Sequence, residues 1–93
     1  MRLYELTVIF PVEEDRHRLG RERLLADFAN YGVEIVKADE AGDRDLAYEV
    51  KKNRRGKYVF FVVKVEPDKV ATLDRIFKLN ANLLKYFFVN IED

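Results

Sequence analysis

The stretch "YVFFVVKVEPD", residues 58–68, joins the most β-prone run of the chain to the start of a helix. Residues 58–66 are rich in β-branched and aromatic side chains, which favour a strand. Pro67 suits the first turn of a helix because its missing N–H needs no partner there, and we expect Asp68 to be the N-cap. The stretch therefore predicts a strand followed directly by a helix.

The chain after Asp68 predicts one more helix and one more strand. Apolar residues recur at helical spacing and form the expected buried stripe: Val70, Leu73, Ile76 and Phe77. Residues 83–91, "LLKYFFVNI", are again β-prone and predict the final strand.

The first third of the chain shows the same order of elements. Residues 3–10, "LYELTVIF", alternate, with an expected core face of Tyr4, Leu6, Val8 and Phe10. Pro11 ends this strand, because proline cannot donate to a ladder. A helix follows over 14–31, with the apolar residues Leu24, Leu25, Phe28 and Tyr31, and Gly32 ends it in the left-handed conformation.

The middle of the chain leaves two alternatives. Residues 33–39 and 46–52 both read as strands, with Ala41-Gly42 between them. Either these are two short strands, or one long strand is broken by a bulge at Gly42. "NRRG", residues 53–56, is expected to form the hairpin turn that leads into the strand of residues 58–66.

The order strand–helix–strand, repeated twice, is typical of the split βαβ arrangement. The sequence predicts one α+β domain, residues 1–93, with the ferredoxin-like order βαββαβ. Two helices would cover one face of a four-stranded antiparallel sheet and leave the other face open. On that open face we expect Tyr58, Phe60 and Tyr86.

Composition argues against catalysis. The chain has no cysteine, which excludes disulfides and thiolate metal sites, and no apolar run long enough to span a membrane, so we expect a soluble cytoplasmic protein. His17 is the only histidine, and no glycine-rich phosphate loop is present. We therefore expect no enzyme activity, no metal and no cofactor.

Charge is balanced overall but unevenly distributed. The 17 basic and 17 acidic residues cancel, whereas residues 39–45, "DEAGDRD", are mainly acidic and residues 51–57, "KKNRRGK", carry five bases. The basic residues could contact phosphate or simply protect a sheet edge, and the residues alone leave these readings about even. The candidate contacts are Lys51, Lys52, Arg54, Arg55, Lys57 and, on the open face, Phe60. Phe60 could stack on a base or anchor a protein.

Three segments carry a family resemblance: "MRLYEL" (1–6), "GDRDLAYEVKK" (42–52) and "FKLNANLLKYFFV" (77–89). Their order and spacing resemble the bacterial small-subunit ribosomal protein six family over essentially the whole chain. The middle segment is the specific one, because it resembles the family's signature of Gly, polar or basic residues, Leu-Ala-Tyr and a β-branched residue. The matching residues are Gly42, Arg44, Leu46, Ala47, Tyr48 and Val50.

The resemblance implies a non-enzymatic constituent of the small ribosomal subunit. Such proteins pair with small-subunit ribosomal protein eighteen and bind the central domain of small-subunit rRNA, so that a basic partner can supply much of the phosphate binding. The acidic segment 39–45 is then a hypothetical counter-surface for that partner. The resemblance adds the candidate contacts Arg2, Tyr4, Arg44 and Tyr48, and also Lys78 and Lys85, where family members often have Arg. The alternative is a ferredoxin-like protein-interaction or ligand-sensing module without RNA binding.

Overall fold

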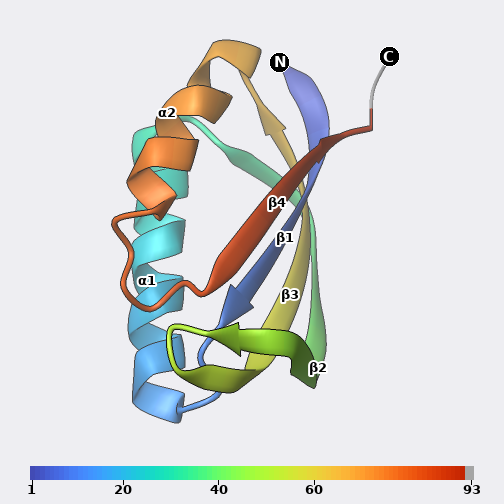
Figure 1. Cartoon of the computed structure of the whole chain (residues 1–93). Coiled ribbons are helices and arrows are strands. Elements are labelled where there is room, and N and C mark those ends of the chain that lie inside the picture. The colour runs from blue at the N-terminus through green and yellow to red at the C-terminus, as the bar shows by residue number, and fades with distance from the viewer. Residues whose placement is uncertain (92–93) are drawn as a thin grey trace.

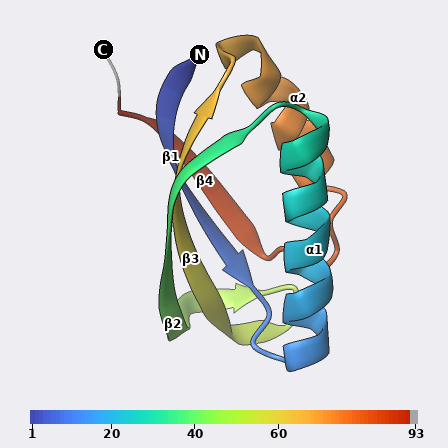
Figure 2. The same ribbon diagram turned by 180° about the vertical axis from the view of Figure 1, so that it is seen from behind.

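A computed structural model describes residues 1–91 and has two helices packed on one sheet. The strands are β1 (Arg2–Phe10), β2 (Glu34–Val50), β3 (Asn53–Val65) and β4 (Lys85–Asn90), and the helices are α1 (Glu14–Asn30) and α2 (Pro67–Phe77). The sheet is antiparallel with the order β2-β3-β1-β4. Figures 1 and 2 show both helices on one face, while the other face is uncovered. The predicted ferredoxin-like fold is confirmed.

The core lies between the helices and the inner face of the sheet. Its fully buried side chains include Leu6, Val8, Phe10, Val59, Phe61, Val63, Leu24 and Leu73. Phe28 of α1 packs edge-to-face on Phe61 and on Phe77 of α2, with ring centroids 5.5 and 6.2 Å apart. The predicted alternation of β1 and β3 is confirmed. Leu25 is 39% exposed instead of buried, because it lies about 100° around the helix from Leu24.

Helix α1 begins and ends with regular caps. The carboxylate of Glu13 accepts hydrogen bonds from the backbone N–H groups of Asp15 and Arg16, both at 3.0 Å, and these bonds lower the pKa of Glu13. At the other end Gly32 adopts a φ of +69°, as predicted, and the N–H of the next residue donates to the Phe28 carbonyl at 2.9 Å. This is the glycine-dependent Schellman closure.

Helix α2 begins slightly earlier than predicted. Its N-cap is Glu66, and Pro67 is its first residue. Asp68 is therefore not the cap but lies in the first turn, where its charge favours the positive end of the helix. The proline sets this start because its fixed φ already suits a helix.

Strand β2 is one long strand with a bulge, so the second alternative for the middle of the chain is right. Glu40 pairs with Val59 and Gly42 pairs with Tyr58, which leaves residue 41 as the extra residue. Gly42 has a φ of +79°, a conformation that side chains with a Cβ rarely adopt. The bulge bends the strand and increases its local twist.

Gly42→Val is expected to lower the free energy of unfolding by about 1–2 kcal/mol, because a β-branched residue is strained at this φ. Beyond the two adjacent residues, no atom of residues 1–91 lies within 4 Å of the position that a Cβ would take, so the cost comes from backbone strain and not from a clash. Denaturant unfolding measures the effect. Ala41→Val, one residue earlier and at negative φ, is the matched control. Equal stability of the two variants would contradict the assignment of the bulge.

The hairpin turn lies at Lys51 and Lys52 and not at residues 53–56, so that prediction is wrong. Both lysines have positive φ, 48° and 66°, between the paired residues Val50 and Asn53. This is the two-residue turn whose twist matches the flanking strands. The Asn53 side-chain amide donates to the Lys51 carbonyl at 2.9 Å, which supports a conformation that lysine seldom adopts.

Gly56 serves close packing instead of a turn. A Cβ at this position would lie 2.2 Å from Cγ2 of Ile9 and 3.4 Å from Leu46. Residues 43–57, here called the arm, therefore pack tightly where they cross the end of the sheet (Figure 1).

Tyr86 faces the helices, contrary to the prediction that it lies on the open face. It pairs with Val8, which points into the core, and its ring packs on Phe77 with centroids 5.4 Å apart. Its hydroxyl donates to Oδ1 of Asp74 at 2.6 Å. The alternation of β4 instead places Lys85, Phe87 and Val89 on the open face.

The Tyr86–Asp74 contact predicts two pH dependences. Burial, followed by the Asp74 contact, raises the pKa of Tyr86 to about 12, so the stability that it contributes is complete below about pH 10 and is lost as the pH rises through 12. The hydrogen bond from Tyr86, followed by that from Lys78, lowers the pKa of Asp74. The stability that Asp74 contributes is therefore present above the ordinary pKa of an aspartate and is lost as the pH falls through the lowered pKa.

Tyr86→Phe is therefore expected to raise the pKa of Asp74 and to remove the loss of stability between pH 10 and 12. NMR titration of the Asp74 carboxyl and urea unfolding against pH measure the two effects. Tyr58→Phe, on the other face, is the control and is expected to leave the Asp74 titration unchanged. An Asp74 pKa that is the same in Tyr86→Phe and wild type would refute the coupling.

Candidate functional site

The acidic and basic segments that are separate in the sequence pair with each other across the arm. The register sets Asp43 opposite Lys57 and Asp45 opposite Arg55. The ion-pair distances are 3.4 Å for Lys57 Nζ to Asp43 and 3.3 Å for Arg55 Nε to Asp45. The other two carboxylates of residues 39–45 also have cationic partners, Lys37 with Asp39 and Arg21 with Glu40. These carboxylates are thus already paired within the chain, and the role of this segment as a counter-surface for a protein partner stays a prediction.

The remaining basic residues of the arm differ in how they are held. Lys51 donates from Nζ to the carbonyl of Leu83 at 3.0 Å, which ties the turn of the arm to the loop between α2 and β4. Lys52 and Arg54 are exposed and form no ion pair within residues 1–91. These two side chains are available for an external anion.

Arg44 lies over two aromatic rings on the open face. Its guanidinium carbon is 5.4 Å from the ring centroid of Tyr58 and 5.7 Å from that of Phe60. A cation at this distance is attracted to the face of the ring. Two candidates from different strands, Arg44 and Phe60, are thus brought together, and Arg44 is held in place without an acidic partner in the described part of the chain.

Tyr48 and Lys85 also meet although they are distant in the sequence. Nζ of Lys85 lies 4.2 Å from the Tyr48 ring centroid and donates to the Tyr48 hydroxyl. Beneath this contact is an apolar pocket of about 140 Å³, whose lining includes Ile9, Leu46 and Phe87. The Tyr48 side chain remains 62% exposed, so it can still contact another molecule.

The open face carries exposed apolar side chains that the sequence analysis missed in part. Phe60, Val62, Phe87 and Val89 flank Thr7 and Glu5 of β1, and we call these four residues the sheet patch. Phe87 is 51% and Val89 53% exposed. The alternation within β4 is the signal that predicts the exposure of Phe87 and Val89, once Tyr86 is placed on the side of the helices. Exposed apolar groups that share one face are typical of an interaction surface.

The other candidates lie away from the arm. Tyr4 is 8% exposed, with its ring edge-on to Phe88 in the core, so it is not the surface contact that was expected. Lys78, at the end of α2, pairs with Asp74 at 3.2 Å. Arg2 begins β1 near the end of the molecule that holds the N-terminus, opposite the arm (Figure 1). The twelve candidate residues therefore do not form one site.

The described residues offer little acid–base chemistry. His17 packs edge-to-face on Phe10, and burial lowers the pKa of His17. Residues 1–91 contain no group of three or more acidic, histidine or cysteine side chains placed to hold a metal ion. None of the helices in this range is long and apolar enough to cross a membrane. What the surface presents is stacked cations, aromatic rings and the sheet patch, all of which suit binding.

The sequence has close relatives among known proteins. The family model described as Ribosomal protein S6 matches residues 3–90. The chain is 47% identical over 93 residues to small ribosomal subunit protein bS6 of Treponema denticola, with all of both chains covered. It is 37% identical over 95 aligned residues to bS6 of Halalkalibacterium halodurans, again with all of both covered.

Two solved structures share the fold. The 30S ribosomal protein S6 from Thermotoga maritima matches with a TM-score of 0.79 and 22% identity, covering 96% of this chain and 86% of that one. The C-terminal domain of MgtC from Mycobacterium tuberculosis matches with a TM-score of 0.62 and 11% identity, covering 99% and 89%. At these identities the two structures support the fold alone.

Proposed function

The chain belongs to the ribosomal protein S6 family of structural, non-enzymatic small-subunit proteins, and we propose that it binds the central domain of small-subunit rRNA together with small-subunit ribosomal protein eighteen. The observation that carries this proposal is the likeness to bS6 proteins over the full length of the chain. As a constituent of the small subunit it works in the cytoplasm.

The charge of the protein supports shared rather than solitary RNA binding. The net charge is zero, and several cations are already paired with acids of the same chain, among them Arg18, Arg21, Arg55 and Lys57. RNA-binding domains that act alone are usually strongly basic, because phosphate contacts dominate their affinity. A basic protein partner would supply the missing phosphate contacts.

We assign binding of the protein partner and binding of RNA to two different surfaces. The sheet patch is apolar, and Phe60, Phe87 and Val89 in it are exposed, so we assign it to the protein partner, since aromatic residues are enriched where proteins meet. Lys52 and Arg54 of the arm have no acidic partner within the described residues, and Arg44 is fixed on its two rings, so we assign these three to RNA.

The first test is binding of the chain to a central-domain rRNA fragment, with and without protein eighteen, across a salt series. Tight binding only in the presence of the partner, weakening as salt rises, is the expected result. Absence of binding under both conditions would overturn the proposal and favour an interaction module that does not bind RNA.

Phe87→Glu tests the assignment of the sheet patch. A charge at this half-exposed position is expected to weaken binding of protein eighteen at least about tenfold, because the carboxylate would be desolvated in the interface, while leaving the melting temperature nearly unchanged. Calorimetric titration with the partner measures it. Leu19→Glu on α1, at 48% exposure, is the matched control. Equal affinities of the two variants would place the partner elsewhere.

A further inference from the structure

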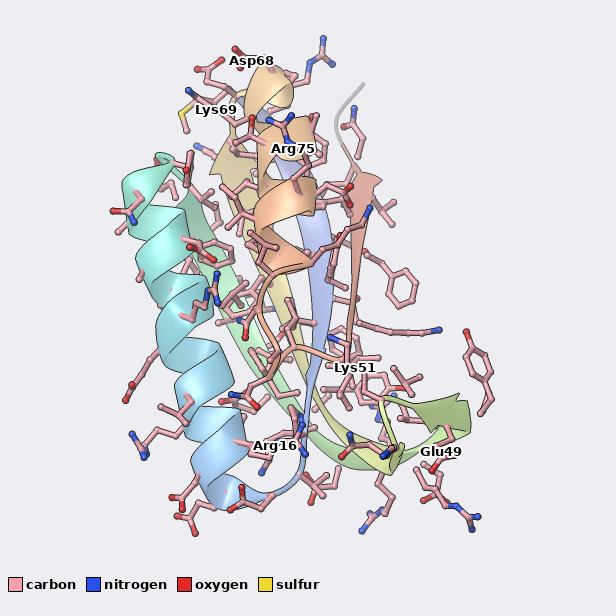
Figure 3. All side chains as sticks on the ribbon, turned by 60° about the vertical axis from the view of Figure 1, so that its left-hand side comes forward. Arg16, Glu49, Lys51, Asp68, Lys69 and Arg75 are labelled. Carbon is pink, nitrogen blue, oxygen red and sulfur yellow. The ribbon has the colours of Figure 1, made fainter. Side chains whose placement is uncertain are left out.

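Two cations from distant parts of the chain are fixed on neighbouring residues of the loop between α2 and β4. Arg16 of α1 donates from Nε to Oδ1 of Asn82 at 3.2 Å, and Lys51 of the arm donates from Nζ to the carbonyl of Leu83 at 3.0 Å. Figure 3 shows Arg16 and Lys51 on the same side of the molecule, with the loop passing between α1 and the arm.

A third cation is fixed on the same loop. Arg23 donates from Nη1 to the carbonyl of Leu79 at 3.0 Å. Arg23 follows Arg16 by seven residues, which is close to two helical turns, so both lie on one face of α1 and about 10 Å apart along its axis. The acceptors on residues 79–83 span at most about 14 Å of extended chain. The three cations therefore form a short row.

The row carries positive charge that neutral acceptors do not cancel. All three partners are carbonyl or amide oxygens, and none of the three cations has an ion pair in the described part of the chain. Two carboxylates interact with the row: Glu13 with Arg16, and Asp27 with Arg23. Glu13 is occupied with capping α1, and Asp27 forms no ion pair with Arg23 within residues 1–91. Burial raises the pKa of Asp27, and Arg23 opposes this shift.

We propose that Arg16, Arg23 and Lys51, the loop cations, bind consecutive phosphates of an RNA backbone. This inference rests on the proposed function and adds residues of α1, which the sequence analysis did not single out. Each arginine uses one of its five donors for the loop and the lysine one of its three, so the remaining donors are free to face an anion. Anchoring by the loop reduces the side-chain entropy lost on binding.

The row fits the spacing of a nucleic-acid strand. Successive phosphates of a nucleic-acid strand lie closer together than the length of this row, so the row faces several of them. Phosphate contacts set the position of a protein on RNA without reading its sequence. The loop cations would therefore orient the α1 side of the protein on the backbone, while Arg44 and the arm contact RNA from the other side of the turn.

The test compares salt dependences of binding to the central-domain rRNA fragment in the presence of protein eighteen. The triple variant Arg16→Gln, Arg23→Gln and Lys51→Gln is expected to reduce the slope of log affinity against log salt by about 2–3. Its affinity at low salt is expected to fall on the order of a hundredfold. The charge-retaining variant Arg16→Lys, Arg23→Lys and Lys51→Arg is expected to keep the slope.

The matched control removes the same charge from cations that have acidic partners: Arg18→Gln, Arg21→Gln and Lys37→Gln. This control separates local contacts from the change in net charge, and its slope is expected to change much less. Should the triple variant not fold, Arg23→Gln alone removes an exposed hydrogen bond and is expected to lower the slope by about 1.

The outcomes distinguish this inference from the proposed function. If wild type binds the rRNA fragment and the Gln variants keep the wild-type slope, the loop cations are not phosphate contacts and the proposed function stands. If wild type does not bind even with protein eighteen, the proposed function is overturned, and this inference with it.

Discussion

Gly20→Ala is expected to lower the free energy of unfolding by about 2–3 kcal/mol, although alanine is the better helix former. A Cβ at residue 20 would lie 2.1 Å from the backbone carbonyl oxygen of Asn82, where α1 packs on the loop before β4. The helix gains about 1 kcal/mol from alanine. Overpacking typically costs about 1–3 kcal/mol and occasionally more, and because this clash is with backbone we expect a cost of about 3–4 kcal/mol. For a domain of this size the melting temperature would fall by about 10–20 °C.

Gly32→Ala separates the clash from the effect of adding a methyl group to a glycine. Gly32 has a φ of +69°, and beyond its two adjacent residues no atom of the described part of the chain lies within 4 Å of the position that a Cβ would take there. Gly32→Ala is expected to lower the free energy of unfolding by less, about 1 kcal/mol, because only the left-handed conformation is penalised. Thermal unfolding of both variants measures the difference. A Gly20→Ala protein as stable as wild type would show that the loop does not contact α1 in this way.

Asn80→Asp is expected to be at least as destabilising at neutral pH, by about 3–5 kcal/mol. Asn80 is 2% exposed; its amide donates to the Gly20 carbonyl at 3.1 Å, and its side-chain oxygen accepts from the N–H of Asn82 at 3.1 Å. A carboxylate still accepts, but it cannot donate, so two oxygens would face each other in a buried site. Such an uncompensated buried charge costs several kcal/mol.

The loss of stability in Asn80→Asp is expected to depend on pH. Burial favours the neutral carboxylic acid, whose O–H can donate to Gly20, and the nearby Arg16 and Arg23 donate to Asn82 and Leu79 instead of to residue 80. The deficit relative to wild type is therefore expected to shrink as the pH falls from 7 towards 4. Urea unfolding at a series of pH values measures it. Asn82→Asp is the control, because its side-chain oxygen accepts from Arg16 and a carboxylate there gains an ion pair. A deficit independent of pH would argue against a buried charge.

The sequence was sufficient to predict the elements that are determined by residues close together in the chain. The alternation of β1, the apolar spacing of α2 and the glycine that ends α1 all depend on neighbours within a few residues. The bulge at Gly42 was one of two open alternatives, because a glycine between β-prone runs can end a strand or bend it. Register decided between them, and register is set by contacts with β3.

The sequence failed where distant segments determine the outcome. Gly56 suggested a turn, but it serves the close approach of Ile9, while the turn lies on two lysines that carry no such signal. Tyr86 was expected on the wrong face because alternation alone does not say which side of β4 points to the helices; its pairing with Val8 of β1 decides this. Likewise, the pairing of Asp43 with Lys57 depends on the hairpin register. Folding therefore brings together acidic and basic segments that are separate in the sequence.

The position of β1 between β3 and β4 has a consequence for how the protein is made. The last strand pairs with the first, with Tyr4 opposite Asn90, and β4 ends about 80 residues after β1. At synthesis rates of about 5–20 residues per second, β1 emerges from the ribosome roughly 4–16 seconds before its second partner exists. The hairpin of β2 and β3 can form during that interval, but one edge of β1 has no strand to pair with. The sheet therefore cannot close before β4 is made, and a chain stalled before β4 would leave the backbone N–H and C=O groups along one edge of β1 unpaired.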